Sequence, residues 1–180
     1  MSARQCNGCT LCCKLIPADL PSGKKLAGER CPHQRANKGC AIYAYRPLPC
    51  AMWNCRWLIN ADTADLRRPD RSHYVIDIVP DFITLIEDDD KAKSIKIEVV
   101  QIWVDPDFRD AYKDPALLAY LARRGEQNVA AIIRYSSSEG FVMFPPSMTS
   151  SGTFIEKDHG MVRQRDMRER LAGLAEARGQ

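Results

Sequence analysis

The feature that most constrains this chain is the placement of its cysteines, because all eight lie within the first 55 of its 180 residues. Their order is Cys6-x2-Cys9-x2-Cys12-Cys13-x17-Cys31-x8-Cys40-x9-Cys50-x4-Cys55. Structural disulfides belong mainly to oxidising compartments. The start of the chain lacks the apolar core of a secretory signal, and no apolar run approaches the roughly 20 residues of a membrane helix. We therefore expect a cytoplasmic protein, not associated with membranes, whose cysteines bind metal ions.

The spacing of the cysteines suits metal ligands. Two cysteines separated by two residues can place both sulfurs about 2.3 Å from one metal ion, and Gly8 would give the first such turn a permissive backbone. If this segment is helical, Cys9, Cys12 and Cys13 share a face, although the adjacent pair diverges enough to serve different metals. Cys50 and Cys55 are five apart and would point away from each other on a regular helix. Eight thiols match two four-thiolate sites, and all eight are predicted ligands.

The sequence favours zinc but leaves an alternative open. Two zinc ions would explain the number of cysteines and would order a loop-rich segment. The Cys6-x2-Cys9-x2-Cys12 run also repeats the first three ligands of a bacterial ferredoxin, although the fourth would fall at Ile16. Thiolates suit both metals, so iron or a 4Fe-4S cluster, in a redox protein or an enzyme, is the alternative. His33 is a further candidate ligand, but a solvated loop position is favoured. No catalytic residue is identified.

The net charge of +3 hides an asymmetry along the chain. Residues 1–60 contain nine Lys and Arg against two acidic residues, and the rest of the chain is acidic on balance. A basic, aromatic-rich segment is typical of nucleic-acid binding. Compensation of negative metal–thiolate centres is the favoured explanation, and a nucleic-acid or protein-binding module is the alternative; no protein partner is indicated. The aromatic residues of this segment are expected to form its hydrophobic core, namely Tyr43, Tyr45, Trp53 and Trp57.

Two motifs resemble a known family. The Cys6-x2-Cys9-x2-Cys12-Cys13 opening and the later Cys40-x2-Tyr43-x2-Arg46-Pro47-x2-Cys50 segment are similar to those of the YkgJ-type zinc- or iron-chelating cysteine-cluster proteins. The resemblance covers residues 6–55. It implies metal binding through seven of the cysteines, without fixing the metal, and Cys55 matches less well. Flagellin lysine-N-methylases have a similar cluster in a much longer chain, so their activity is not carried over.

The remaining pattern predicts an α+β protein. We expect a short helix over 10–16, loops over 17–46 and one helix over 47–60. Alternating apolar residues predict strands at 73–79, 82–87 and 94–104, with a turn at 88–91, and a hairpin from 129–135 and 141–144. Asp114 and Pro115 would begin another helix, and 164–178 a last one. Asp105, Asp107 and Asp110 are expected in a surface loop. The prediction is a metal-bound, cysteine-rich head (residues 1–60) packed on a small antiparallel sheet with two or three helices in the body (residues 61–180).

Overall fold

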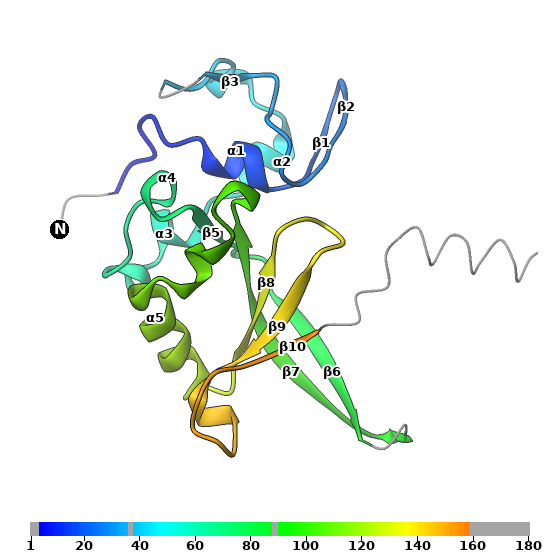
Figure 1. Ribbon diagram of the computed structural model, residues 1–180. Helices are drawn as coiled ribbons and strands as arrows, with labels where there is room; N and C mark the ends of the chain where they lie inside the picture. Colours follow the sequence, from blue (N-terminus) through cyan, green and yellow to red (C-terminus); the bar gives the residue numbers. More distant parts are fainter. Residues whose placement is uncertain (1–3, 36–37, 88–89, 159–180) are drawn as a thin grey trace, which may run out of the picture.

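Six strands form one mixed sheet in the computed structural model, which describes residues 4–35, 38–87 and 90–158 (Figure 1). The strands are β5 Tyr74–Ile76, β6 Asp81–Glu87, β7 Asp90–Val104, β8 Ala130–Arg134, β9 Gly140–Phe144 and β10 Ile155–Asp158. Their order is β10-β9-β8-β7-β5, and β6 also pairs with β7. Most pairs are antiparallel, but β7 and β8 run parallel. The α+β class is confirmed, whereas the purely antiparallel sheet is wrong. The chain returns from β7 to β8 through a helix, and such a crossover restores the strand direction.

Five α-helices lie among the described residues, three in the head and two in the body, where two or three were expected. The α-helices are α1 Leu11–Leu15, α2 Leu48–Met52, α3 Arg56–Ile59, α4 Pro69–Ser72 and α5 Pro115–Gly125. Short 3-10 segments are η1 Tyr43–Tyr45, η2 Ala61–Thr63, η3 Pro106–Lys113 and η4 Pro146–Met148. Two small ribbons complete the head, formed by β1 Ala18–Leu20 with β2 Gly23–Lys25 and by β3 Gln34–Arg35 with β4 Gly39–Cys40. Among the described helices, none is long and apolar enough to cross a membrane.

The body follows the predicted pattern of elements closely. The three expected strands correspond to β5, β6 and β7, and the expected hairpin is β8 with β9. Helix α5 begins where its cap predicts, because the Asp114 carboxylate accepts a hydrogen bond from the backbone N–H of Ala116 at 3.1 Å. The predicted helix at 164–178 lies outside the described residues, as do residues 88–89 of the predicted turn.

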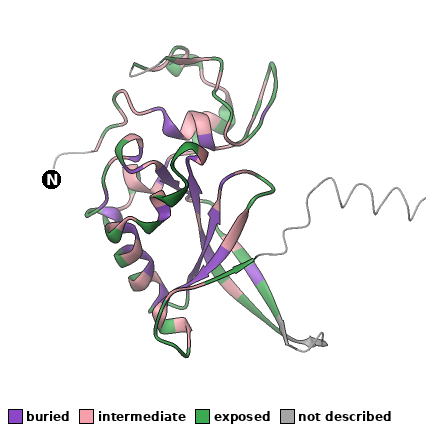
Figure 2. Cartoon of the chain, viewed as in Figure 1, coloured by how far each residue is buried: buried purple, intermediate pink, exposed green. Residues whose placement is uncertain are grey.

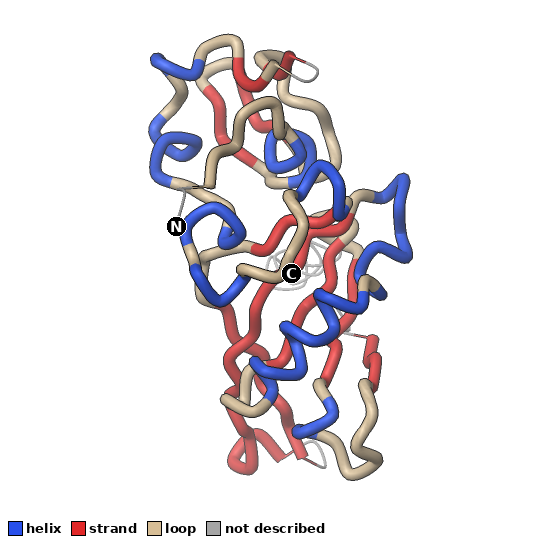
Figure 3. Tube along the Cα trace, turned by 90° about the vertical axis from the view of Figure 1, so that its left-hand side faces the viewer, coloured by secondary structure: helices blue, strands red, loops and turns tan. Residues whose placement is uncertain are grey.

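The sheet buries a different cluster on each face because side chains alternate along a strand. Val100, Ile102 and Val104 of β7 face α5, whose Leu117 and Leu121 are fully buried against them. On the opposite face, a second cluster lies around Val99, Ile132, Val142 and Phe144, and a third includes Val75 and Trp103. Buried residues accordingly line the strands and the inner side of α5 (Figure 2). Figure 3 shows α5 lying across one side of the sheet.

The head lies at one end of the sheet and contacts the body through buried groups (Figure 1). Leu11, Leu15 and Cys55 pack with Val75 and Trp103 in the third cluster. Head and body therefore share apolar core residues, and the division at residue 60 stays a prediction.

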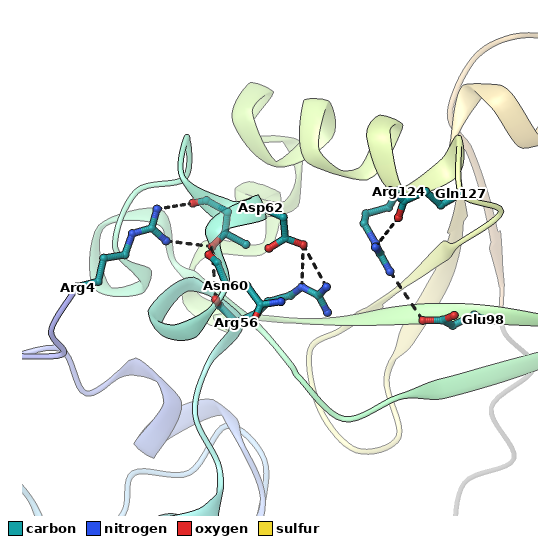
Figure 4. A network of polar contacts seen from close by, with 8 residues as sticks. Arg4, Arg56, Asn60, Asp62, Glu98, Arg124 and Gln127 are labelled. Carbon is teal, nitrogen blue, oxygen red and sulfur yellow. Dashed lines mark hydrogen bonds and ion pairs between the residues drawn. The ribbon is translucent and has the colours of Figure 1, made fainter. Parts of the chain in front are cut away.

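Polar contacts also join the head to the rest of the chain. The Arg4 guanidinium donates to the side chain and the carbonyl of Thr63, each at 3.0 Å, in the network drawn in Figure 4. Lys14 lies 2.6 Å from carboxylate oxygens of both Asp105 and Asp107. The surface-loop prediction for Asp105 is therefore wrong, because its side chain is buried against a cation supplied by the head.

Candidate metal centre

The first four cysteines lie on a tight turn and the helix that follows it. The N–H of Cys9 donates to the carbonyl of Cys6 at 2.8 Å, which closes the turn. Asn7 adopts the left-handed conformation in this turn (φ 46°), which Asn tolerates better than most residues. Gly8, which the sequence suggested for that role, has no positive φ. Helix α1 then carries the adjacent pair Cys12 and Cys13, as predicted.

The two middle cysteines fold back onto this segment. The N–H of Cys31 donates to the carbonyl of Cys13 at 3.1 Å. A second turn follows, in which the N–H of Gln34 donates to the carbonyl of Cys31 at 3.0 Å. Gln34 also pairs with Cys40 across the β3–β4 ribbon. A side chain on Gly39 would lie 3.3 Å from the carbonyl oxygen of Asn7, so the ribbon also approaches the first turn closely.

The last two cysteines come from a helix that breaks. The sequence predicted one helix over 47–60, but α2 ends at Met52 and α3 begins at Arg56. Between them Trp53 and Cys55 are extended, with ψ of 132° and 147°. The break lets the Trp53 indole donate to the Asp77 carboxylate at 2.8 Å and turns Cys55 into the core, where it is 7% exposed. A continuous helix would satisfy neither contact.

The thiols lie close enough for their charges to influence one another. Burial, then the charge of Cys13, raises the pKa of Cys6, and burial likewise raises that of Cys9, with a smaller contribution from Cys6. Burial raises the pKa of Cys55 to about 11, with the charges of Cys6 and Cys9 adding to it. These three residues belong to two segments that are far apart in the sequence.

Cys12 and Cys13 differ in spite of being adjacent. A hydrogen bond between their side chains, together with burial, holds the pKa of Cys12 well above its usual value, and Cys55 and Cys9 are among the charges that add to this. The same hydrogen bond, and then the charge of Lys25, lowers the pKa of Cys13 to about 7. Burial, and then the charges of Cys13, Cys31 and Cys40, raise the pKa of Cys50. Four chain segments therefore supply thiols to one region.

A buried lysine accompanies these thiols and was not identified from the sequence. Lys25 is 7% exposed, and its Nζ donates to the carbonyls of Lys14, Ile16 and Leu26 at 3.1, 2.6 and 3.0 Å. Burial lowers its pKa, and the charges that oppose this are, largest first, Cys31 and Cys13. A buried cation is costly unless it is compensated, so this lysine suits a negatively charged thiolate group. No sequence signal separates it from the neighbouring Lys24.

The four aromatic residues predicted to form the core of the head divide into two that are partly buried and two that are exposed. Trp53 and Trp57 pack against the third cluster, as expected of core residues. Tyr43 and Tyr45 are 59% and 88% exposed, so their assignment to the core is wrong. The Arg46 guanidinium instead lies over the Tyr43 ring, 4.2 Å from the ring centroid. His33 uses its carbonyl to accept from the N–H of Ala41.

The residues present fit a metal site in the type of donor atom and in the charges around it, but their side chains do not converge on one point. All eight cysteines are free thiols. Across the described part of the chain, no group of three or more His, Cys, Asp or Glu side chains converges closely enough to hold a metal ion. A bound metal would therefore need the thiols to be drawn together, and metal binding stays a prediction.

Comparisons with protein-family models, curated proteins and solved structures find no match to this chain. The likeness to the YkgJ-type proteins therefore depends on the motif residues alone.

Proposed function

We propose that this protein binds metal through its eight cysteines, in two four-thiolate sites, with a structural or accessory role. The observation that carries the proposal is that backbone contacts and packing bring segments with free cysteines, distant in the sequence, together in the head. Zinc is the favoured metal, since it is held by four thiolates in structural sites and ties loops together. The residues concerned are Cys6, Cys9, Cys12, Cys13, Cys31, Cys40, Cys50 and Cys55.

Cations lie among these thiols and oppose the rise in pKa that burial causes. Besides Lys25, the charges of Arg46 and Arg68 act on Cys6 and favour its ionised form. Arg68 is itself held by Asp70 through two hydrogen bonds of 2.7 Å. Fixed cations beside ligands of this kind lower the cost of collecting negative charge, as groups around metal sites commonly do.

Iron–sulfur chemistry is the second candidate function. The closed Cys6–Cys9 turn followed by Cys12 retains the spacing of the first three ligands of the ferredoxin run. A four-iron cluster would make the protein a redox protein or an enzyme. Nucleic-acid binding is favoured by one observation, the exposure of Tyr45 and Tyr43 beside Arg46, because exposed aromatic rings near cations can stack bases. Salt-sensitive binding to a single-stranded oligonucleotide would distinguish it.

Elemental analysis of protein purified anaerobically tests the proposal. We expect about two equivalents of zinc per chain, or iron with matching acid-labile sulfide and a brown colour if the alternative holds. Cys9→Ser should lose metal, because removing one thiolate opens a closed site. Ala41→Ser, an exposed change in the same head, is the control and should retain the full content. Wild-type protein that contains neither metal, although both were supplied during expression, would contradict the proposal.

A further inference from the structure

The backbone separates the adjacent cysteines of α1 into different surroundings. Cys12 packs against the third cluster together with Cys9, and Cys55 is one of the buried members of that cluster. Cys13 instead accepts, through its carbonyl, the hydrogen bond from Cys31. The two side chains share a hydrogen bond, so the pair lies where the packing beside the sheet meets the backbone contacts of the outer head.

The remaining cysteines divide along the same line. Cys6 is tied to Cys9 by the hydrogen bond that closes the first turn. Cys40 is tied to Cys31 through Gln34, which bonds the carbonyl of one and pairs with the other. The charges that act on the thiols follow this division in part. Cys6 and Cys9 raise the pKa of Cys55, and Cys13, Cys31 and Cys40 raise that of Cys50, whereas Cys13 also acts across the division on Cys6 and Cys12.

From these contacts we infer that the cysteines form two defined four-thiolate sites, Cys6/Cys9/Cys12/Cys55 beside the sheet and Cys13/Cys31/Cys40/Cys50 in the outer head. The inference rests on the proposed function and adds the assignment of each ligand. The two sites lie next to each other, because Cys12 and Cys13 are adjacent and Cys13 also acts on Cys6. Lys25 belongs with the outer site, because the thiol charges that act on it most strongly are those of Cys31 and Cys13.

The assignment also explains why the head breaks its last helix. On a continuous helix Cys50 and Cys55 would project in different directions from one rigid rod. The extended residues Trp53 to Cys55 let α2 keep Cys50 with the ribbon while Cys55 enters the core beside α1.

A crossed pair of double variants tests the division. Cys12→Ser/Cys55→Ser removes two ligands from one site, so this variant should keep about half of the wild-type metal. Cys13→Ser/Cys55→Ser removes one ligand from each site and should keep less than about a tenth. The reciprocal set gives the matched control: Cys13→Ser/Cys40→Ser should keep about half, and Cys12→Ser/Cys40→Ser almost none. Each chain is purified anaerobically and its metal is measured per chain by elemental analysis.

A second form of the test avoids loss of folded protein. If serine variants precipitate, the same crosses are made with histidine, which remains a metal ligand. In chains loaded with Co²⁺, Cys12→His/Cys55→His should change the absorption of half of the bound cobalt, and Cys13→His/Cys55→His that of all of it. Equal effects of the two crosses, in protein that binds metal normally, would overturn the division while leaving metal binding intact. A wild-type chain with a single centre would also overturn it. A wild-type chain without metal would instead overturn the proposed function.

Discussion

Asp77 joins the head to the sheet through two tryptophans, and replacing it should have a measurable cost. Its buried carboxylate accepts from the Trp53 indole at 2.8 Å, from the Trp103 indole at 3.1 Å and from the N–H of Val79 at 3.0 Å. Trp53 belongs to the head, whereas Trp103 lies on β7. Asp77→Asn preserves the size of the side chain but leaves one oxygen in place of two, so one indole must face an N–H group.

The magnitude follows from what is lost. A hydrogen bond to a charged group contributes about 1.5–3 kcal/mol, and the bonds that remain are weakened because the acceptor becomes neutral. We expect Asp77→Asn to lower the free energy of unfolding by about 2–4 kcal/mol. For a chain of this length the melting temperature should fall by roughly 4–16 °C. Folding should survive, because domains typically have about 5–15 kcal/mol to lose.

Denaturant unfolding, followed by far-UV circular dichroism and tryptophan fluorescence at a fixed metal concentration, measures this change. Fluorescence reports directly on the joint, since two of the three tryptophans contact Asp77. Asp65→Asn is the control: it removes the same charge, but its side chain is 75% exposed and lies 3.7 Å from Arg123. If the two variants unfold within about 0.5 kcal/mol of each other, the carboxylate does not hold the head to the sheet.

Two further predictions concern the hairpin and the cysteine pair. Gly140→Ala should destabilise the protein by about 2 kcal/mol or more, because its Cβ would lie 2.2 Å from the carbonyl oxygen of Ile133; exposed Ser137→Ala is the control, and equal unfolding midpoints would contradict the prediction. In metal-free protein, Cys13 should react with iodoacetamide before Cys12 at neutral pH, and its rate should fall as the pH drops below about 7, because only the thiolate reacts. Mass mapping of the labelled peptides measures both rates, and equal labelling of the two cysteines would refute the assigned hydrogen bond.

The body was predictable from local pattern, since its strands alternate and its long helix carries its own cap and proline. The parallel pairing of β7 with β8 was missed, although a signal was present. Residues 129–133 form an uninterrupted apolar run in which every residue is buried, and such a run is typical of a central strand covered on both faces. With a helix before it, the pattern indicates a strand–helix–strand crossover.

The head was less predictable because distant residues decide its structure. The candidate ligands and the short helix could be identified from the cysteine pattern. The break after Met52 was not, since it depends on Asp77, which lies 24 residues beyond Trp53. The burial of Lys25 likewise depends on carbonyls of α1 and the residues after it. Local propensity alone predicts an exposed Lys25 and a continuous helix through Trp53.

The two proposed sites would couple to the fold in different ways. A head that folded independently of the body would loosen alone when its metal is removed. Cys55, however, shares one cluster with Val75 on β5 and Trp103 on β7, so a metal at the inner site would stabilise part of the sheet itself. The outer site contacts the sheet through the head, chiefly by way of α1, Lys14 and its partner Asp105. Loss of the inner metal should therefore weaken the joint that Asp77 also holds, whereas loss of the outer metal should chiefly release the β3–β4 ribbon and the loops around it.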